Sequence, residues 1–107
     1  MEIRFEWDLV KAEINLKKHQ VSFEEAKTVF YDPNALLISD PDHSDLDEDR
    51  FIIMGISSNS KLLVVCHCYR ENDETIRIIS ARKAEGNEIK QYGGQKKWET
   101  VMIFQMQ

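Results

Sequence analysis

The sequence has only two cysteines, and no apolar run approaches the length of a membrane-spanning helix. Its first residues, Met-Glu-Ile-Arg-Phe, also lack the apolar core of a signal peptide. The 42% of apolar and 31% of charged residues are typical of a soluble protein, and 107 residues suffice for one hydrophobic core but not for two. We therefore expect a single domain without a membrane segment, located in the cytoplasm.

The two cysteines give no indication of a disulfide or of a metal site. Cys66 and Cys68 lie two residues apart in a predicted strand, so their side chains share a face in a geometry unsuited to a mutual disulfide. His67 would point to the opposite face, and no second Cys/His pair completes four metal ligands. We interpret both cysteines as small core residues, which fits a reducing compartment, and we expect no cofactor.

The formal net charge of −5 argues against a nucleic-acid partner until its distribution is considered. Setting aside one acidic block leaves 13 of the 19 acidic side chains against 14 basic ones, a balance of +1. A nearly neutral body can carry a basic cleft, and we expect the acidic block to lie elsewhere. The block comprises Asp40, Asp42, Asp45, Asp47, Glu48 and Asp49.

Hydrophobic periodicity predicts an α+β fold. Asp8 and Ser22 are suitable N-caps for two helices, and Glu25 completes a capping box with Ser22. We expect four antiparallel strands, a short N-terminal strand that can join their sheet, two N-terminal helices on one face, and a C-terminal helix. In order, the expected elements are a strand at 3–6, a helix from 9 to about 19, a helix from 23 that ends before 32–34, strands at 35–39 and 51–56, a hairpin over 62–84 with its turn at 71–74, and a helix from 83 to about 92.

Gly93-Gly94 separates residues 1–94, which we expect to form the domain, from the extension 95–107. The extension is dense in large apolar side chains, and exposed apolar surface of this density is uncommon. We therefore expect it to be a docking element outside the active site, which either folds back onto the sheet or, as we favour, pairs with a second copy of the chain. The side chains are Trp98, Val101, Met102, Ile103 and Phe104.

Polar residues interrupt the most apolar part of the chain, the hairpin. Arginine keeps its charge at any working pH, and an isolated charge is expensive to bury, so these positions indicate an anionic partner. The alternative is that Arg77 and Arg82 pair with local acids such as Glu71, Asp73 or Glu74. The interrupting residues are His67, Arg70, Arg77, Ser80 and Arg82.

A series of motifs runs in order along most of the chain and ends near Tyr92. The motifs are Phe5-Glu6-Trp7-Asp8, Lys11, Asn15, Lys18-His19, Val21-Ser22-Phe23-Glu24-Glu25-Ala26 and Ile76-Arg77-Ile78-Ile79-Ser80-Ala81-Arg82-Lys83-Ala84. Together they resemble the BrnT family of bacterial toxins. One departure is Gln20, which follows Lys18-His19 where such sequences usually have glycine.

The resemblance implies a RelE-like fold and a metal-independent endoribonuclease that blocks translation. It also implies a BrnA-type antitoxin, encoded beside the toxin, which neutralises it and binds DNA, so that this chain would contact DNA only indirectly. Two alternatives stay open: a non-catalytic module whose arginines bind an acidic protein, and a degenerate toxin that keeps the fold and antitoxin binding without activity.

Metal-free cleavage of RNA uses the 2′-hydroxyl of the substrate as nucleophile and needs a base, an acid and cations around the phosphate. His67 is the natural titrating group, and Arg70, Arg77 and Arg82 can fork onto phosphate oxygens beside Ser80. Each residue also has a purely structural alternative, such as a core position or a solvated surface. Candidate RNA-binding residues are Trp7, Lys11, Lys18, His19, Lys83 and Tyr92.

Strand geometry sets a condition on this catalytic cluster. In a regular strand, side chains three or five positions apart point to opposite faces. His67 and Arg70 would therefore diverge, and so would Arg77 and Arg82. We expect all four to converge only if a β-bulge or a strand end redirects one member of each pair.

Overall fold

The computed structural model describes residues 3–40, 44, 48–70 and 74–93. The predicted extension 95–107, most of the hairpin turn and part of the acidic block lie outside the described residues. No helix among the described residues is long and apolar enough to cross a membrane.

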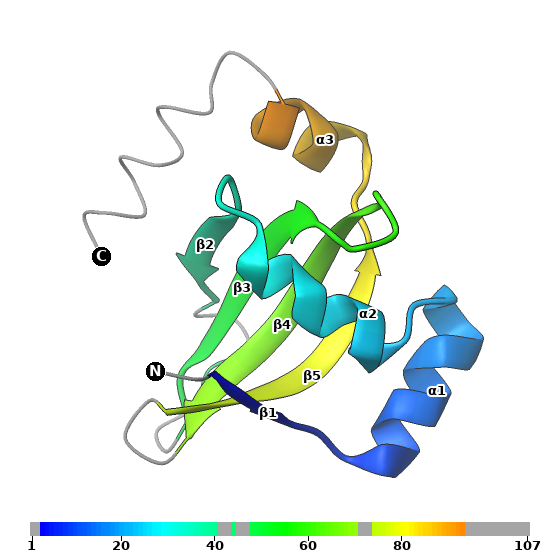
Figure 1. Cartoon of the computed structure of the whole chain (residues 1–107), viewed down its shortest axis with the longest axis vertical. Helices are drawn as coiled ribbons and strands as arrows, with labels where there is room; N and C mark the ends of the chain where they lie inside the picture. Colours follow the sequence, from blue (N-terminus) through cyan, green and yellow to red (C-terminus); the bar gives the residue numbers. More distant parts are fainter. Residues whose placement is uncertain (1–2, 41–43, 45–47, 71–73, 94–107) are drawn as a thin grey trace.

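The described residues form a five-stranded sheet with the order β1-β5-β4-β3-β2 (Figure 1). Strands β2 to β5 form an antiparallel meander, and β1 adds to the edge of β5 in parallel. The predicted α+β class is confirmed, including the short N-terminal strand. The strands are β1 (Arg4–Glu6), β2 (Leu36–Ser39), β3 (Arg50–Ile56), β4 (Leu62–Arg70) and β5 (Thr75–Lys83).

Helices follow the expected order with two differences. The second helix changes from α2 (Phe23–Lys27) to a 3₁₀ turn, η1 (Thr28–Tyr31). The C-terminal helix α3 spans Gly86–Gly93 and starts later than predicted, because β5 continues to Lys83, opposite Leu63. The first helix, α1, spans Leu9–His19.

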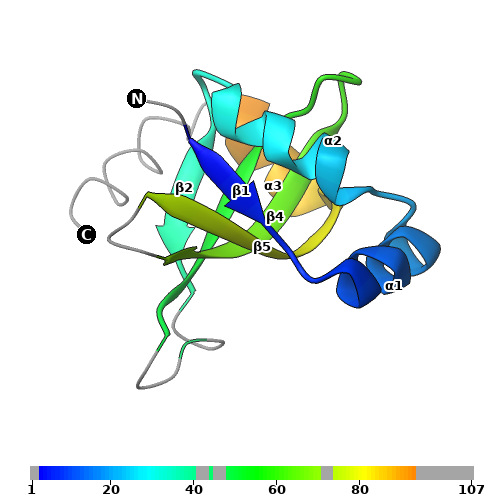
Figure 2. The same cartoon turned by 60° about the horizontal axis from the view of Figure 1, so that its bottom comes forward.

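Helix α2 and η1 cross one face of the sheet and bury the main core (Figure 2). Phe23, Ala26 and Val29 meet Leu63 and Val65, and all five side chains are almost fully buried. Burying a large apolar side chain contributes roughly 1.5–3 kcal/mol, so this contact fixes which face of the sheet is covered. We call the other side the open face.

The helix starts follow the capping chemistry that the sequence predicts. The Asp8 carboxylate accepts hydrogen bonds from the N–H groups of Val10 and Lys11 at 2.8 and 3.0 Å. The Ser22 hydroxyl accepts from the N–H of Glu25 at 3.0 Å, but the Glu25 carboxylate accepts from Ser57 at 2.7 Å. The predicted capping box is therefore half formed, because its carboxylate ties α2 to the turn after β3.

Gln20 ends α1 in the left-handed conformation, with φ 57° and ψ 32°. Its N–H donates to the carbonyl of Leu16 at 2.9 Å, which closes the last turn of the helix. Glycine adopts this conformation without strain, whereas a residue with a Cβ atom does so at a cost of roughly 1 kcal/mol. The departure from the family pattern at Gln20 therefore falls on a backbone position that favours glycine.

Asn15 connects α1 to the rest of the molecule. Its side chain is only 6% exposed, and its amide group donates to the carbonyl oxygens of Val21 and Ala81, both at 2.9 Å. Its carbonyl oxygen accepts from the N–H of Ala81 at 3.1 Å. Strand β1 pairs only with the beginning of β5, from Thr75 to Arg77, so Asn15 bonds the backbone of β5 where β1 has already ended.

The open face carries a second, smaller apolar cluster near α3. It consists of Leu36, Met54 and Val64, and Tyr92 packs against it. The Tyr92 hydroxyl donates to the Asp32 carboxylate at 2.5 Å, and burial together with this bond raises the pKa of Tyr92 to about 12. Helix α3 therefore covers one end of the open face.

We predict that Asn15→Ala destabilises the protein by about 3 kcal/mol, because three backbone groups lose their partner and an unsatisfied buried group costs about 1–3 kcal/mol. Urea unfolding followed by circular dichroism measures the change. Glu13→Ala, on the exposed side of the same helix, serves as the control. A loss as small as that of the control would contradict the role of Asn15.

Candidate functional site

A β-bulge in β5 brings the hairpin arginines to one face. Cys66 lies opposite Ser80, but the next residue of β4, His67, lies opposite Ile78. Ile79 is therefore an extra residue, and both Ile79 and Ser80 line the same cleft on the open face. Because the bulge shifts the alternation by one position, Arg77 and Arg82 share that face. We expected Arg77 and Arg82 to share a face only if a bulge or a strand end redirects one of them, and the bulge at Ile79 does so.

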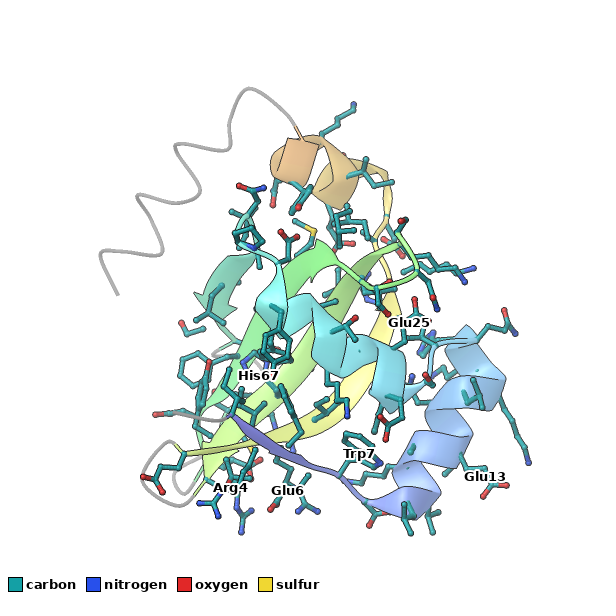
Figure 3. The ribbon with its side chains drawn as sticks, in the orientation of Figure 1. Arg4, Glu6, Trp7, Glu13, Glu25 and His67 are labelled. Atoms are coloured by element: carbon teal, nitrogen blue, oxygen red, sulfur yellow. The ribbon has the colours of Figure 1, made fainter. Side chains whose placement is uncertain are left out.

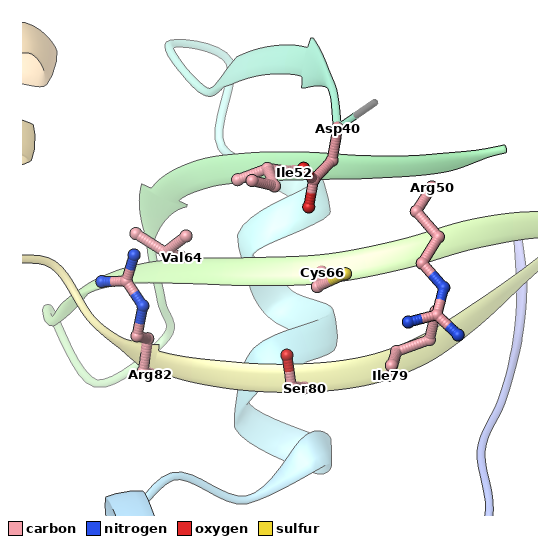
Figure 4. Close-up of a pocket in the computed structure, with 8 residues that line it drawn as sticks. All are labelled: Asp40, Arg50, Ile52, Val64, Cys66, Ile79, Ser80 and Arg82. Atoms are coloured by element: carbon pink, nitrogen blue, oxygen red, sulfur yellow. The ribbon is translucent and has the colours of Figure 1, made fainter. Parts of the chain in front are cut away.

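A cleft of about 210 Å³ opens on this face, between the ends of β2 and β5. Figure 4 shows Arg82 at one end and Arg50 at the other, with Cys66 and Ser80 between them. Two cationic forks and a hydroxyl around one cleft suit an anionic group that carries several oxygen atoms. The lining residues are Asp40, Arg50, Ile52, Val64, Cys66, Ile79, Ser80 and Arg82.

Backbone hydrogen bonds fix Asp40 and Arg50 relative to each other. The Asp40 N–H donates to the carbonyl of Arg50 at 2.8 Å, which extends the pairing of β2 with β3 by one step. The Ser44 hydroxyl donates to the carbonyl of Asp40 at 2.8 Å and accepts from the N–H of Arg50 at 2.9 Å. The two ends of the acidic segment are therefore clamped together at the cleft.

Arg82 binds the carboxylate of Glu88, on α3, through both ends of its guanidinium. The two nitrogen–oxygen distances are 2.9 and 2.8 Å, and Arg82 lowers the pKa of the Glu88 carboxyl. The same carboxylate accepts from the N–H of Glu85 at 2.7 Å, just before the first turn of α3. The Glu88 carboxylate thus both orients the Arg82 guanidinium and caps helix α3.

Other arginines of the open face also meet carboxylates. Arg77 donates to Glu6 at 2.7 Å, and the Glu48 carboxylate lies 3.1 Å from Arg50 and 3.9 Å from Arg70. Among the described residues, the carboxylates that pair with Arg77 and Arg82 are therefore Glu6 of β1 and Glu88 of α3, and not Glu74 of the hairpin; Glu71 and Asp73 lie outside the described residues.

Two residues of the acidic block are not where we expected them. Asp40 and Glu48 lie among the arginines of the open face, whereas we expected the block to be remote from a basic cleft; Asp42, Asp45 and Asp47 lie outside the described residues. Glu74, the described acid of the hairpin turn, pairs with Arg4 at 3.3 Å. The electrostatic character of the face is thus mixed, with cations and anions alternating across it.

His67 does not join the arginines. It lies on the helix-covered face, fully buried, with its ring 4.8 Å from the ring of Phe30 (Figure 3). Nδ1 lies 3.2 Å from the carbonyl of Val65, and Nε2 lies 3.3 Å from the Tyr69 hydroxyl. Burial lowers the pKa of His67 to about 4, so the ring is neutral near pH 7. The condition for convergence is not met for His67 and Arg70, because the extra residue of the bulge lies in β5 and leaves the alternation of β4 unchanged, so His67 does not join Arg70, Arg77 and Arg82.

The remaining candidate residues are spread over several surfaces. Trp7 packs edge-on against Phe23, with ring centroids 5.9 Å apart, and belongs to the margin of the core. Lys11 and Lys18 are exposed on α1, and His19 is half-buried at its end. Lys83 is exposed at the end of β5, next to Arg82, whereas Tyr92 covers the second apolar cluster. Of these six residues, Tyr92 packs against a cluster that includes Val64, a residue of the cleft wall, whereas Lys83 neighbours Arg82 in sequence but pairs with Leu63 of the covered core.

The two cysteines have different environments. Cys68 is fully buried, as expected, but Cys66 is half-buried and lines the cleft. Burial raises the pKa of both thiols. Within the described ranges, no group of three or more His, Cys, Asp and Glu side chains is placed to hold a metal ion.

Sequence reasoning missed Asp40 and Arg50 as residues of the site. Both lie at the ends of the acidic segment, which reads as a solvated loop when only its composition is considered. A usable signal was their position, because each one flanks a predicted strand and can therefore meet the other at a sheet edge.

Fold and cleft together define a small α+β protein whose sheet carries arginines and carboxylates around a cleft on its open face. A model of the ribonuclease toxin BrnT, of type II toxin–antitoxin systems, matches residues 7–88. The chain therefore belongs to the BrnT family of ribonuclease toxins, and the resemblance found in the sequence is confirmed.

A solved structure supports the fold. The crystal structure of the ribonuclease toxin BrnT from Brucella abortus is similar to this chain with a TM-score of 0.59 and 20% sequence identity. The match covers 79% of this chain and 100% of that one. Comparison with curated proteins finds no significant match.

The buried ring of His67 predicts a loss of stability on mild acidification. The unfolded chain takes up a proton near the ordinary pKa of 6.5, whereas the folded chain does so only near 4. The free energy of unfolding therefore falls as the pH drops from 6.5 to 4, by up to about 3 kcal/mol from this group. Urea unfolding at pH 7, 6, 5 and 4.5 measures this loss.

His67→Gln, which does not titrate, should be less stable than the wild type at pH 7, and the difference should shrink towards pH 4.5. His19→Gln controls for the loss of a histidine as such. A constant difference between wild type and His67→Gln across this range would show that the His67 ring does not resist protonation.

Proposed function

We propose that the open-face cleft is the active site of a metal-independent endoribonuclease that inhibits translation. The observation that carries the proposal is the placement of Arg50 and Arg82 at opposite ends of one cleft, with the Ser80 hydroxyl between them. Membership of a ribonuclease toxin family supplies the substrate class, RNA. A phosphodiester held between two guanidinium groups would have its developing negative charge stabilised from both sides.

The contact between Arg82 and Glu88 supports a role for Arg82 in binding phosphate. Its bidentate contact with Glu88 has the geometry of an arginine–phosphate pair, with two parallel N–H···O bonds. The side chains of Arg82 and Glu88 are 38% and 27% exposed, and ion pairs of this kind are worth only about 0–1 kcal/mol. A substrate phosphate can therefore share or replace the Glu88 carboxylate at little cost.

The other arginines extend the face along which an RNA strand would lie. Arg70 and Arg77 come from β4 and β5. Lys83 pairs with Leu63 and therefore points to the other side of the sheet, so it is proposed only as a more distant RNA contact. Lys11, Lys18 and His19 on α1, and the rings of Trp7 and Tyr92, are proposed as more distant RNA contacts. No proton transfer is assigned to His67, because the sheet separates it from the cleft.

We further propose that a BrnA-type antitoxin, which itself binds DNA, neutralises the toxin by covering the open face. Membership of a type II toxin family implies an antitoxin partner. Cleavage depends in this proposal on access of RNA to Arg50 and Arg82, so a partner that occludes this face would silence the activity without unfolding the toxin.

One observation favours a second candidate, a toxin-like module that binds its partner but does not cleave RNA. Arg50, Arg70, Arg77 and Arg82 each lie within 4 Å of a carboxylate of the same chain. Such pairs suffice to explain the arginines as structural residues of a mixed-charge face. Cleavage of RNA by the isolated protein separates the two candidates.

We predict that the purified, partner-free protein cleaves single-stranded RNA in buffer containing EDTA, because the proposed site stabilises charge with arginines. Denaturing gel electrophoresis of an end-labelled RNA follows the reaction, and protein inactivated by heat is the control. Absence of products in EDTA with their appearance on adding Mg²⁺ would refute metal independence. Absence of cleavage in both buffers would favour the non-catalytic module.

Replacement of Arg82 should separate its charge from its geometry. We expect Arg82→Ala to slow cleavage by about 100-fold to 1,000-fold, the usual effect of losing one contact to a developing oxyanion. Arg82→Lys keeps the charge but loses the fork, so it should recover only part of the rate. Growth arrest on expression in a host cell should weaken in the same order.

Lys27→Ala is the matched control, because it removes one positive charge from α2, on the other side of the sheet. Circular dichroism establishes that each variant is folded. If Arg82→Ala unfolds the protein, or if Lys27→Ala slows cleavage as much, then Arg82 is a structural residue and the cleft is not the site.

A further inference from the structure

The end of β2 contributes a carboxylate to the cleft. Asp40 follows the last residue of β2, is 8% exposed and lines the cleft with Arg50, Ser80 and Arg82. In Figure 4 its carboxylate points from the β2 side over Cys66, towards Ser80, between the two arginines. An acidic residue therefore faces the space where the proposed function places a phosphate, although a carboxylate repels a phosphate.

Two features distinguish Asp40 from the other acids of the open face. Glu6 and Glu88 bind Arg77 and Arg82 through short ion pairs, and Glu48 lies between two arginines, so these carboxylates serve to orient cations. Asp40 instead faces the centre of the cleft, and its backbone is clamped to Arg50 by the direct bond and by the Ser44 hydroxyl. The main chain of Asp40 is therefore fixed, and its carboxylate lines the cleft in which the proposed function places an anion.

We propose that Asp40 is the catalytic base, which accepts the proton of the attacking 2′-hydroxyl of RNA; the inference rests on the proposed function. In this proposal, the ribose that precedes a phosphodiester bound between Arg50 and Arg82 meets the cleft wall that Asp40 forms. A base acts from within hydrogen-bonding distance of the proton that it removes, and a carboxylate that lines the cleft between the two arginines can come within that distance.

The reaction balances without a metal ion or a further reactant. Asp40 takes the proton from the 2′-oxygen, the bond from that oxygen to phosphorus forms, and the bond from phosphorus to the 5′-oxygen breaks. The departing 5′-oxygen takes a proton from water, and Asp40 returns its own proton to the solvent. The products are a 2′,3′-cyclic phosphate and a 5′-hydroxyl, with no net change in protons.

The test compares Asp40→Asn with the wild type under single-turnover conditions. Loss of a general base slows a reaction by about 100-fold to 10,000-fold, so we expect the cleavage rate to fall at least to the lower bound. The Kd for a non-cleavable RNA with 2′-O-methyl groups should stay near the wild-type value or improve, because a negative charge leaves the phosphate site. Asp40→Glu keeps a carboxylate and should be faster than Asp40→Asn.

Asp49→Asn is the matched control, because it removes the same charge from an exposed position of the same acidic segment. It should cleave at the wild-type rate. A substrate with sulfur in place of the 5′-oxygen adds a second criterion, because its leaving group needs no proton. This substrate rescues an enzyme that lacks its acid but not one that lacks its base.

Four results would overturn the proposal: cleavage by Asp40→Asn at the rate of the Asp49→Asn control, loss of RNA binding together with cleavage, loss of the folded circular dichroism spectrum, or rescue by the sulfur substrate. An active wild type with an active Asp40→Asn variant refutes only the role of Asp40. An inactive wild type refutes the proposed function itself.

Discussion

The amide group of Asn15 is the contact on which the relative positions of the helical and sheet parts depend. Its three hydrogen bonds bind α1 to the carbonyl of Val21, at the start of the second helix, and to both backbone groups of Ala81 in β5. The Asn15 side chain thus bonds both the N–H and the carbonyl of Ala81, as the backbone of a neighbouring strand would. Since Ala81 stands between Ser80 and Arg82, the same contact holds the middle of the cleft wall in place.

The sheet divides the polar residues of the hairpin according to what each can tolerate. A neutral imidazole can be buried when both of its nitrogens have partners, so His67 lies among aromatic rings on the covered face. A guanidinium keeps its charge, so the arginines lie on the open face, where solvent and carboxylates surround them. Because the two groups require different surroundings, their proximity in the sequence does not predict proximity in space.

Local signals predicted most of the fold. Asp8 and Ser22 cap helices where the sequence indicates, and the order of strands follows from short connections between apolar segments. Non-local features could not be predicted in this way. Glu25 bonds Ser57 in another element instead of completing its own cap, and α3 starts late because β5 finds a partner in β4 as far as Lys83.

The site was predictable only in part, for the same reason. Arg77, Ser80 and Arg82 stand out in an apolar strand, and the need for a bulge could be stated in advance. The contribution of the acidic segment could not, because the clamp formed by Ser44 joins residues whose composition indicates only a solvated loop. The number of charges in a segment of the sequence does not show which carboxylates will lie beside which cations in the folded protein.

The bulge at Ile79 lets two arginines that are five positions apart share one face of the sheet. If the same number of residues paired regularly, Arg77 and Arg82 would point to opposite faces, and one of these charged groups would enter the covered core. Omitting Ile79 would instead leave the two arginines four positions apart, so that a regular strand would still carry both on the open face. During the divergence of such a protein, loss of the bulge is therefore tolerated only together with loss of one residue, whereas an insertion or deletion that leaves the bulge in place would separate the two arginines.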